Sequence, residues 1–208
     1  MKVSVIIPAN NEMHSVGDVV RSCKAYCQEV IVVDDGSIDD TARVSEEVGA
    51  KVIRNAANCG LVKSTTNGLR AASGDIVVTL DADGQHDPSD IPKLITPIVS
   101  GYADLVLGRR DEPPPLSERL IARLVGSHVK CRDIGTGFRA FRRGLAQEIR
   151  LWGFCLCGSL VFEAHRCGAR IVEVPTRVRP RKFGISSILS SKRFTSKRRA
   201  PNFFRIDD

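Results

Sequence analysis

Two pairs of carboxylates follow short runs of β-branched and aliphatic residues in this sequence. Asp34 and Asp35 come after the run VIVV, and Asp81 and Asp83 come at the end of the run IVVTL. Open α/β sheets bind ligands at the carboxyl ends of their strands, so we expect all four acids at one edge of a sheet. Carboxylates gathered in this way can hold a cation and the polar groups of a ligand.

The second pair has the composition of a site for a small divalent cation. In the segment Asp81-Ala82-Asp83-Gly84-Gln85, two carboxylates stand two residues apart and an amide oxygen follows them. Hard oxygen ligands of this kind suit Mg²⁺ or Mn²⁺, which keep open positions for the phosphate oxygens of a substrate. Such a cation beside the turn DDGS, which contains Gly36, suits a nucleotide diphosphate whose charge must be neutralised as it leaves.

Other common chemistries lack their signatures. The sequence has no GxGxxG after its first apolar run, no GxxxxGK[ST] loop and no GxSxG turn, which argues against dinucleotide binding, P-loop chemistry and serine hydrolysis. The seven cysteines form no CxxC pair, so we expect free thiols rather than zinc or disulfides.

The acids must be positioned by the elements around them, and these alternate along the first hundred residues. Apolar runs without polar alternation are typical of strands covered on both faces, and hence of a parallel sheet. Such runs occupy residues 3–7, 30–33, 52–53, 76–80 and 105–107, and segments with helical spacing lie at 16–23, 42–48 and 61–72. The alternation predicts an α/β fold with a doubly wound, mostly parallel sheet.

The pattern is looser after Gly108. The segment DEPPP at residues 111–115 can continue neither a strand nor a helix. Beyond it we expect a helix at 116–129, a strand at 135–141, a helix at 159–167 and a strand at 171–174. No core element is expected after Pro175.

The net charge of +7 is concentrated at the C-terminal end. Residues 177–208 contain 10 basic and 2 acidic residues, or +8, whereas residues 1–176 contain 21 and 22, or −1. We therefore expect one folded domain at 1–176 and a separate basic C-terminal segment at 177–208. Because no apolar run is long enough for a signal peptide or a spanning helix, we expect the chain in the cytoplasm.

Several motifs occur in an order that resembles family 2 glycosyltransferases. The resemblance covers roughly residues 3–187 and, within the family, is greatest to the dolichyl-phosphate mannose and glucose synthases. Its motifs are PANNE at Pro8–Glu12, VVDDGS at Val32–Ser37, Asn58 with Gly60, LDADGQHDP at Leu80–Pro88, GRR at Gly108–Arg110, Asp133 with TGFR at Thr136–Arg139, and EVP at Glu173–Pro175.

The resemblance implies a catalytic domain at 1–176 with the GT-A type fold of nucleotide-diphospho-sugar transferases. It implies an inverting, Mg²⁺- or Mn²⁺-dependent transfer of mannose or glucose from GDP-mannose or UDP-glucose to a polyprenyl phosphate of the dolichyl type. It further implies a role in protein glycosylation at the cytosolic face of a membrane, with a membrane-anchored protein as a further partner.

The resemblance also assigns roles to individual residues. Asp81 would contact the nucleotide and the metal, and Asp83 and Gln85 would ligate the metal. Arg109 and Arg139 would face the acceptor phosphate or the donor diphosphate, which a guanidinium fork suits. The rest of the implied nucleotide-sugar site consists of Pro8, Asn10, Glu12, Asp35, Gly36, Ala82 and Arg181. Within that set, Pro8, Glu12 and Asp35 would hold the base and the ribose.

The acceptor decides whether the reaction needs a general base. A lipid phosphate is already an anionic nucleophile near neutral pH, since its second pKa is about 6 by analogy with phosphorylated side chains. A sugar hydroxyl would need a carboxylate to take its proton, and Asp133 is the candidate. Asp133 could equally be a structural residue that bonds the GTGF turn. We count it with Asp83, Arg109 and Arg139 among the catalytic candidates.

The sequence departs from the family pattern at three positions. Asn10 stands where Tyr is frequent, Val62 where the second glycine of NxGxG is expected, and Ser187 where RxxGxSK has its lysine. In the family pattern, the position of Asn10 lies near the base, that of Val62 in the loop beside the nucleotide and that of Ser187 at the diphosphate end of the site.

Two other functions are compatible with the sequence. The first is a family 2 enzyme that acts on a sugar hydroxyl in cell-surface glycan synthesis, which would keep the donor site. The second is a non-catalytic nucleotide-sugar binding protein, and the intact DADGQ argues against it because such a protein would not need this motif. Nucleic acid is not an expected partner, because no recognition motif accompanies the basic segment. Residues 177–199, with nine Lys and Arg and no acid, predict either contact with an anionic bilayer or a solvated tail.

Overall fold

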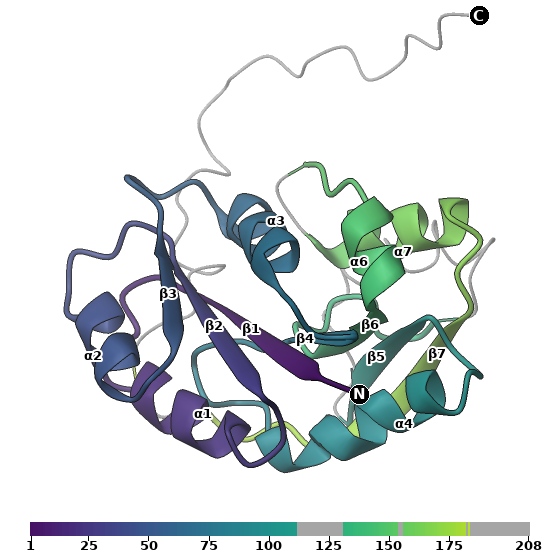
Figure 1. The fold of residues 1–208 in the computed structure, drawn as a ribbon, viewed down its shortest axis with the longest axis horizontal. Coiled ribbons are helices and arrows are strands. Elements are labelled where there is room, and N and C mark those ends of the chain that lie inside the picture. The colour runs from purple at the N-terminus through teal and green to yellow at the C-terminus, as the bar shows by residue number, and fades with distance from the viewer. Residues whose placement is uncertain (112–130, 154–155, 182, 184–208) are drawn as a thin grey trace, which may run out of the picture.

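The computed structural model describes residues 1–111, 131–153, 156–181 and 183, and its seven strands form one sheet (Figure 1). The strands are β1 (Val3–Ala9), β2 (Glu29–Asp34), β3 (Lys51–Arg54), β4 (Ile76–Thr79), β5 (Leu105–Arg110), β6 (Arg139–Arg142) and β7 (Ile171–Thr176). The helices are α1 (Val16–Cys23), α2 (Thr41–Glu47), α3 (Leu61–Ala71), the 3₁₀ turn η1 (Pro88–Asp90), α4 (Ile91–Val99), α6 (Arg143–Glu148) and α7 (Leu156–Arg166).

The sheet is mostly parallel, as the apolar runs predicted. Its strand order is β3-β2-β1-β4-β6-β5-β7, and every adjacent pair is parallel except the two that include β6. Two consecutive parallel strands need a connection that crosses a face of the sheet, and this connection is usually a helix. The alternation of strands and helices in the sequence therefore indicated a parallel sheet. The predicted α/β fold class is confirmed.

The antiparallel strand β6 lies between β4 and β5 and brings a turn to the edge where they end. Arg139, the first residue of β6, is in register with Thr79 at the end of β4 and with Leu107 near the end of β5. The turn at 134–138 therefore lies beside the carboxyl ends of its neighbours. The sequence predicted this strand at 135–141 but not its direction.

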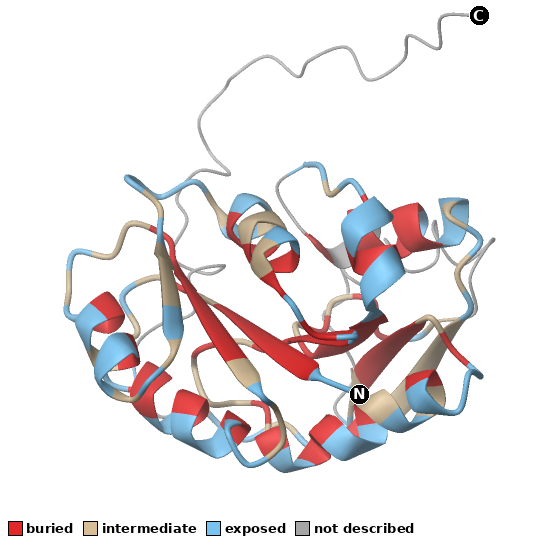
Figure 2. Ribbon diagram, viewed as in Figure 1, coloured by how far each residue is buried: buried red, intermediate tan, exposed pale blue. Residues whose placement is uncertain are grey.

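Helices cover both faces of the sheet (Figure 1). One core packs α1 and α4 against β1, β2 and β4, and the other packs α3, α6 and α7 against the opposite face. The five inner strands are buried almost throughout, whereas the edge strands β3 and β7 are mostly half-buried, and each helix turns its buried side toward the sheet (Figure 2). Burial on both faces is the physical reason that the strands read as continuous apolar runs.

Two helices were missing from the sequence prediction. α4 carries Pro92 at its start and Pro97 inside it, and proline hides a helical pattern. α6 spans only six residues, too few to establish a period. The helix expected at 116–129 lies outside the described residues, as does the segment beyond Phe183. The five cysteines whose side chains the structure describes are free thiols, as expected; they are Cys23, Cys27, Cys59, Cys131 and Cys167.

Candidate active site

The carboxyl ends of β1, β2 and β4 meet at one edge of the sheet. β1 lies between β2 and β4 and is parallel to both, so the chain passes from β1 to β2 and β3 on one side and then crosses to β4 on the other side. Such a switch point opens a crevice at the strand ends, where α/β proteins bind ligands. Asp34 ends β2 and Asp81 follows β4 by two residues, so both acid pairs lie at this edge.

The loop after β4 places its two carboxylates in different environments. The Asp81 side chain is 41% exposed, whereas that of Asp83 is 12% exposed. Burial, and then the negative charge of Asp81, raise the pKa of Asp83 to about 6. The Gln85 backbone N–H donates to Asp83 Oδ1 at 3.0 Å, and Ala82 is buried between the acids. The loop thus holds two carboxylates that repel each other, and a bound cation would relieve this repulsion.

This donor set fits a divalent cation that shares its ligands with a substrate. Across the described residues, no three His, Cys, Asp or Glu side chains come together in a group that could hold a metal ion. The chain therefore offers two carboxylates and the amide oxygen of Gln85. Phosphate oxygens or water would complete the coordination, as Mg²⁺ and Mn²⁺ commonly allow.

Asp81 lies against the turn that precedes β6. A Cβ atom added at Gly137 would lie 2.1 Å from Asp81 Oδ2, so the carboxylate fits only because residue 137 has no side chain. The Thr79 hydroxyl donates to the Gly137 carbonyl at 2.9 Å and ties the turn to β4. His86 is a second neighbour, with Nε2 3.7 Å from Asp81 Oδ2 and its ring packed against Phe138. Burial lowers the pKa of His86, which favours its neutral form.

Residues 177–181 return across the loop that carries the acids. The Arg179 N–H donates to the Gln85 carbonyl at 2.7 Å, and Gln85 Nε2 donates to the Arg179 carbonyl at 3.3 Å. The Arg181 guanidinium then reaches two acids, with Nη1 3.3 Å from Asp83 Oδ2 and Nη2 paired with Glu12 Oε1. The fold thus brings together three expected site residues from distant parts of the chain.

Asp35, which directly follows β2, organises the loop that leads into α3. Asp35 Oδ1 accepts from the Cys59 N–H at 2.9 Å and Oδ2 accepts from the Gly60 N–H at 2.8 Å. Gly36 has a φ of 67°, and a Cβ atom there would lie 2.6 Å from the backbone carbon of Ala57. The buried Asp35 carboxylate thus holds the loop against the DDGS turn, which places both beside the crevice.

The motif PANNE lies where β1 passes into α1. Asn10 Nδ2 donates to the Asp35 carbonyl at 2.8 Å, so this residue links two strand ends at the position where Tyr is frequent. Glu12 Oε2 accepts from the Ser15 hydroxyl at 2.8 Å, while its other oxygen carries the ion pair described above. Pro8 is partly buried on β1 at the same edge.

Arg110 is a site residue that the sequence analysis missed. Its Nε and Nη2 donate to the two oxygens of Asp133 at 2.8 and 2.7 Å, and its backbone N–H donates to Oδ2 at 2.9 Å. Burial alone would raise the pKa of Asp133, but these bonds hold it below the ordinary value. Adjacent side chains of a strand point to opposite faces, so only the register decides which arginine of the motif GRR meets Asp133.

The two arginines expected at the phosphates have different surroundings. The Arg109 carbonyl accepts from the Thr176 hydroxyl at 3.3 Å, and its side chain is partly buried at the end of β5. Arg139 is 1% exposed, and its Nη2 donates to the Ile134 carbonyl at 3.1 Å. Arg139 thus lies beneath the turn that precedes β6, and it would reach a phosphate only if that turn shifts.

A cavity of about 310 Å³ opens beside Asp83. It lies between residues 14–22 and the returning segment, and its lining includes Asp83, Arg179 and Phe183. The Phe183 ring packs against His14 with centroids 5.7 Å apart. A cavity of this size falls within the range of small-ligand pockets.

The motifs and their placement agree with one sequence family. The model of Glycosyl transferase family 2 matches residues 4–120, more than half of the chain. The chain belongs to glycosyl transferase family 2. The family predicted from the ordered motifs is therefore confirmed.

Two curated relatives in this family have named activities. The chain is 35% identical to the dolichol-phosphate mannosyltransferase of Pyrococcus furiosus over 84% of this chain and 56% of that protein. It is 30% identical to the UDP-N-acetylglucosamine–dolichyl-phosphate N-acetylglucosaminyltransferase of Methanococcus voltae over 84% of both proteins. The chain spans little more than half the length of the first relative.

A solved structure shares the fold. Glucosyl-3-phosphoglycerate synthase from Mycobacterium tuberculosis, in complex with Mn²⁺ and UDP-glucose, matches with a TM-score of 0.77 and 27% identity over 90% of this chain and 73% of that chain. Other structures of that enzyme contain Mg²⁺ with UDP, or phosphoglyceric acid. The expected GT-A type fold of this family 2 glycosyltransferase is confirmed.

Proposed function

We propose that this family 2 glycosyltransferase moves a hexose from a nucleotide-diphosphate sugar to a polyprenyl phosphate. GDP-mannose and UDP-glucose are the proposed donors. The acceptor class is supported by the dolichol and dolichyl phosphates in the names of its two relatives.

The observation that carries this choice of acceptor is the state of Asp133. Arg110 engages both of its oxygens, and the carboxylate is completely buried with a lowered pKa. A general base for a hydroxyl acceptor needs an accessible oxygen that can take a proton. An acceptor phosphate brings its own anionic oxygen, so it needs positioning and charge neutralisation instead.

In the proposed reaction, an oxygen of the acceptor phosphate attacks the anomeric carbon of the sugar. A new C–O bond forms as the bond between that carbon and the donor diphosphate breaks, and the electron pair leaves with the nucleotide diphosphate. Attack from the face opposite the leaving group inverts the anomeric configuration. No proton has to be removed from the nucleophile when the phosphate is ionised.

The loop after β4 is the proposed place for the diphosphate. Asp81, Asp83 and Gln85 would hold Mg²⁺ or Mn²⁺, which when bound neutralises charge on the leaving diphosphate. Arg181 already lies beside Asp83 and would add a second positive charge. Arg109 is the proposed contact of the acceptor phosphate or the diphosphate, and Arg139, which is buried, would join it only if the turn that precedes β6 shifts.

The proposed donor pocket lies beside this loop. Pro8, Glu12 and Asp35 are the proposed contacts of the base and the ribose. The remaining proposed contacts of the nucleotide-sugar are Asn10, Gly36 and Ala82.

We further propose that residues 1–176 form the catalytic domain and that the basic segment 177–208 brings it to an anionic membrane surface. The positive charge of this segment supports the proposal. Most of the segment lies outside the described residues. Within the described part of the chain, no helix combines the length and apolar content required to cross a bilayer.

The acceptor is tested with labelled GDP-mannose and UDP-glucose, each supplied with Mn²⁺ and either a polyprenyl phosphate or the matching polyprenol. We expect label in the organic extract only when the acceptor is the polyprenyl phosphate, and none when it is the polyprenol. Asp83→Asn should abolish the transfer, whereas Asp40→Asn, which changes an exposed carboxylate at the start of α2, should retain it.

Transfer to polyprenol, with none to polyprenyl phosphate, would contradict the proposed acceptor. That result would favour the alternative in which a hydroxyl group is glycosylated.

A further inference from the structure

Arg181 lies where the expected metal ligands need a cation. Its Nη1 is 3.3 Å from Asp83 Oδ2 and its Nη2 pairs with Glu12 Oε1, although these acids follow different strands. We propose that Arg181 acts as a built-in counter-cation that competes with the divalent metal for Asp83. The inference rests on the proposed function, because it takes Asp83 as a metal ligand.

The returning segment delivers Arg181 to this position. Residue Val178 forms an antiparallel bridge with His86, and Arg179 pairs through its side chain with Asp87. Arg177 adds a third attachment, because its backbone N–H donates to Asp90 Oδ2 at 3.2 Å. These contacts attach the segment to the loop that carries the proposed metal ligands and to η1, which follows that loop, so the guanidinium and the metal site are physically linked.

Burial strengthens the ion pairs that Arg181 makes with Glu12 and Asp83. The side chains of Arg181, Glu12 and Asp83 are only 20%, 14% and 12% exposed. Partly buried charges are weakly screened by salt, and a buried carboxylate left without a partner is unfavourable. In the absence of metal, the guanidinium therefore stabilises the two acids. A metal ion on Asp83 would face the positive charge of Arg181 and would have to displace it.

The displaced guanidinium needs a new anion, and the diphosphate of the donor is the natural one. Arg181 would then pair with phosphate oxygens, whose geometry suits its fork. Metal and nucleotide diphosphate should consequently bind cooperatively, and the coupling must be reciprocal. The metal alone should bind weakly, and the nucleotide should strengthen its binding.

Mn²⁺ titration followed by electron paramagnetic resonance of the free ion tests the competition without measuring activity. In the absence of nucleotide, we expect Arg181→Gln to bind Mn²⁺ about fivefold more tightly than the unchanged full-length chain, because one competing ion pair is removed. Arg181→Lys, which keeps the charge but loses the fork, should fall between the two. Thermal unfolding of each variant checks that it is folded.

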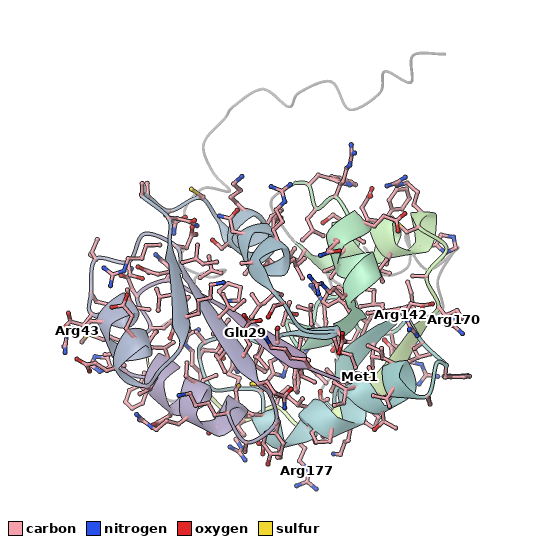
Figure 3. All side chains as sticks on the ribbon, viewed as in Figure 1. Met1, Glu29, Arg43, Arg142, Arg170 and Arg177 are labelled. Atoms are coloured by element: carbon pink, nitrogen blue, oxygen red, sulfur yellow. The ribbon has the colours of Figure 1, made fainter. Side chains whose placement is uncertain are left out.

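The matched control is Arg177→Gln, which removes the same charge from the same segment. The Arg177 side chain projects away from the body of the protein (Figure 3). We expect its Mn²⁺ affinity to equal that of the unchanged chain. An equal gain in Arg177→Gln and Arg181→Gln would overturn the proposal, because only the net charge would then matter.

Equal Mn²⁺ affinity of Arg181→Gln and the unchanged chain, including no measurable binding by either, would also overturn the proposal. Addition of UDP or GDP should raise the Mn²⁺ affinity more in the unchanged chain than in Arg181→Gln. An equal rise would refute the transfer of the guanidinium to the diphosphate. Asp83→Asn distinguishes failure of the metal site from failure of the competition by Arg181. Retained Mn²⁺ binding in that variant would disprove the metal site itself.

Discussion

The position of Asp81 depends on a residue that has no side chain. Gly137 lies so close to this carboxylate that the Cβ atom of any other residue would occupy the space of Oδ1 and Oδ2, at 2.4 and 2.1 Å. The sequence motif GTGF is thus a packing requirement of the proposed donor site. The turn is also fixed on its other side through the hydrogen bond from Thr79.

We expect Gly137→Ala to reduce kcat/KM for sugar transfer about 100-fold, because displacement of a positioning group by about 1 Å has this effect. The measurement is steady-state transfer with the donor and acceptor that support activity. Gly144→Ala is the control, since a Cβ atom at Gly144 in α6 meets no atom within 4 Å. A rate for Gly137→Ala within twofold of the control would show that Asp81 is not held by this contact.

Asp133 illustrates how a contact limits the role of a residue. As a sequence feature it is either a base or a turn residue, whereas in the fold it is locked by Arg110. The same bonds that lower its pKa also occupy its oxygens. At the residue scale, the site is therefore arranged around fixed charges, which suits a reaction governed by charge neutralisation.

At the scale of elements, one acid joins the ends of three strands. Asp104 precedes β5 and pairs with Arg142 at the end of β6, at 3.1 Å, and with Arg170 just before β7, at 2.9 Å. The two arginines lie at the same corner of the sheet (Figure 3). Hydrogen bonds from Arg170, together with the nearby positive charges, lower the pKa of Asp104 to about 2.

We expect Asp104→Asn to lower the free energy of unfolding at pH 7 by about 1 kcal/mol, a value that allows for screening of the half-exposed arginines. The folded-state pKa lies below that of the unfolded chain, so the carboxylate stabilises the fold above pH 5 and loses this effect as pH falls toward 2. Urea unfolding at pH 7 and at about pH 3 measures how much less stable Asp104→Asn is than the unchanged chain. This loss of stability at about pH 3 should be about half of the loss at pH 7.

Asp40→Asn is the control for this measurement. Asp40 pairs with Arg43 on the surface of α2, where both side chains are more than half exposed. Its removal should change stability little at either pH. A pH-independent loss in Asp104→Asn would mean that packing, rather than the charge of Asp104, joins the three strands.

At the scale of the whole molecule, charge is divided between two parts of the sequence. Residues 1–176 are nearly neutral, whereas residues 177–208 carry +8. The first residues of the basic segment are bound at the proposed active site, through Arg179 and Arg181. A membrane contact made by the following residues would therefore act close to the site that we propose for a lipid phosphate.

Replacement of Lys192, Arg193, Lys197, Arg198 and Arg199 by Gln should reduce sedimentation with phosphatidylserine vesicles at least about tenfold, because each basic residue near such a surface contributes about 1 kcal/mol. Neutral phosphatidylcholine vesicles should bind both proteins weakly. Equal replacement of five exposed basic residues of the body, namely Arg21, Arg43, Arg54, Lys93 and Arg166, is the charge-matched control. Equal losses in the two variants would remove the special role of the segment.

The sequence by itself determined the strands, the acid pairs at their ends and the family. This was possible because burial on both faces leaves a continuous apolar run, and because the carboxyl ends of parallel strands meet at one edge. The donor half of the candidate site, from Pro8 to Gln85, could therefore be outlined without coordinates. These signals are local, and each is contained within a few adjacent residues.

Only the tertiary structure decided how the second half of the chain completes the site. The antiparallel direction of β6 brings Gly137 to Asp81, and the register of β5 selects Arg110 as the partner of Asp133. The return of residues 177–181 pairs Arg181 with Glu12, 169 positions earlier in the chain. Such contacts depend on strand direction, register and the path of the connections, and no local pattern of residue types specifies them.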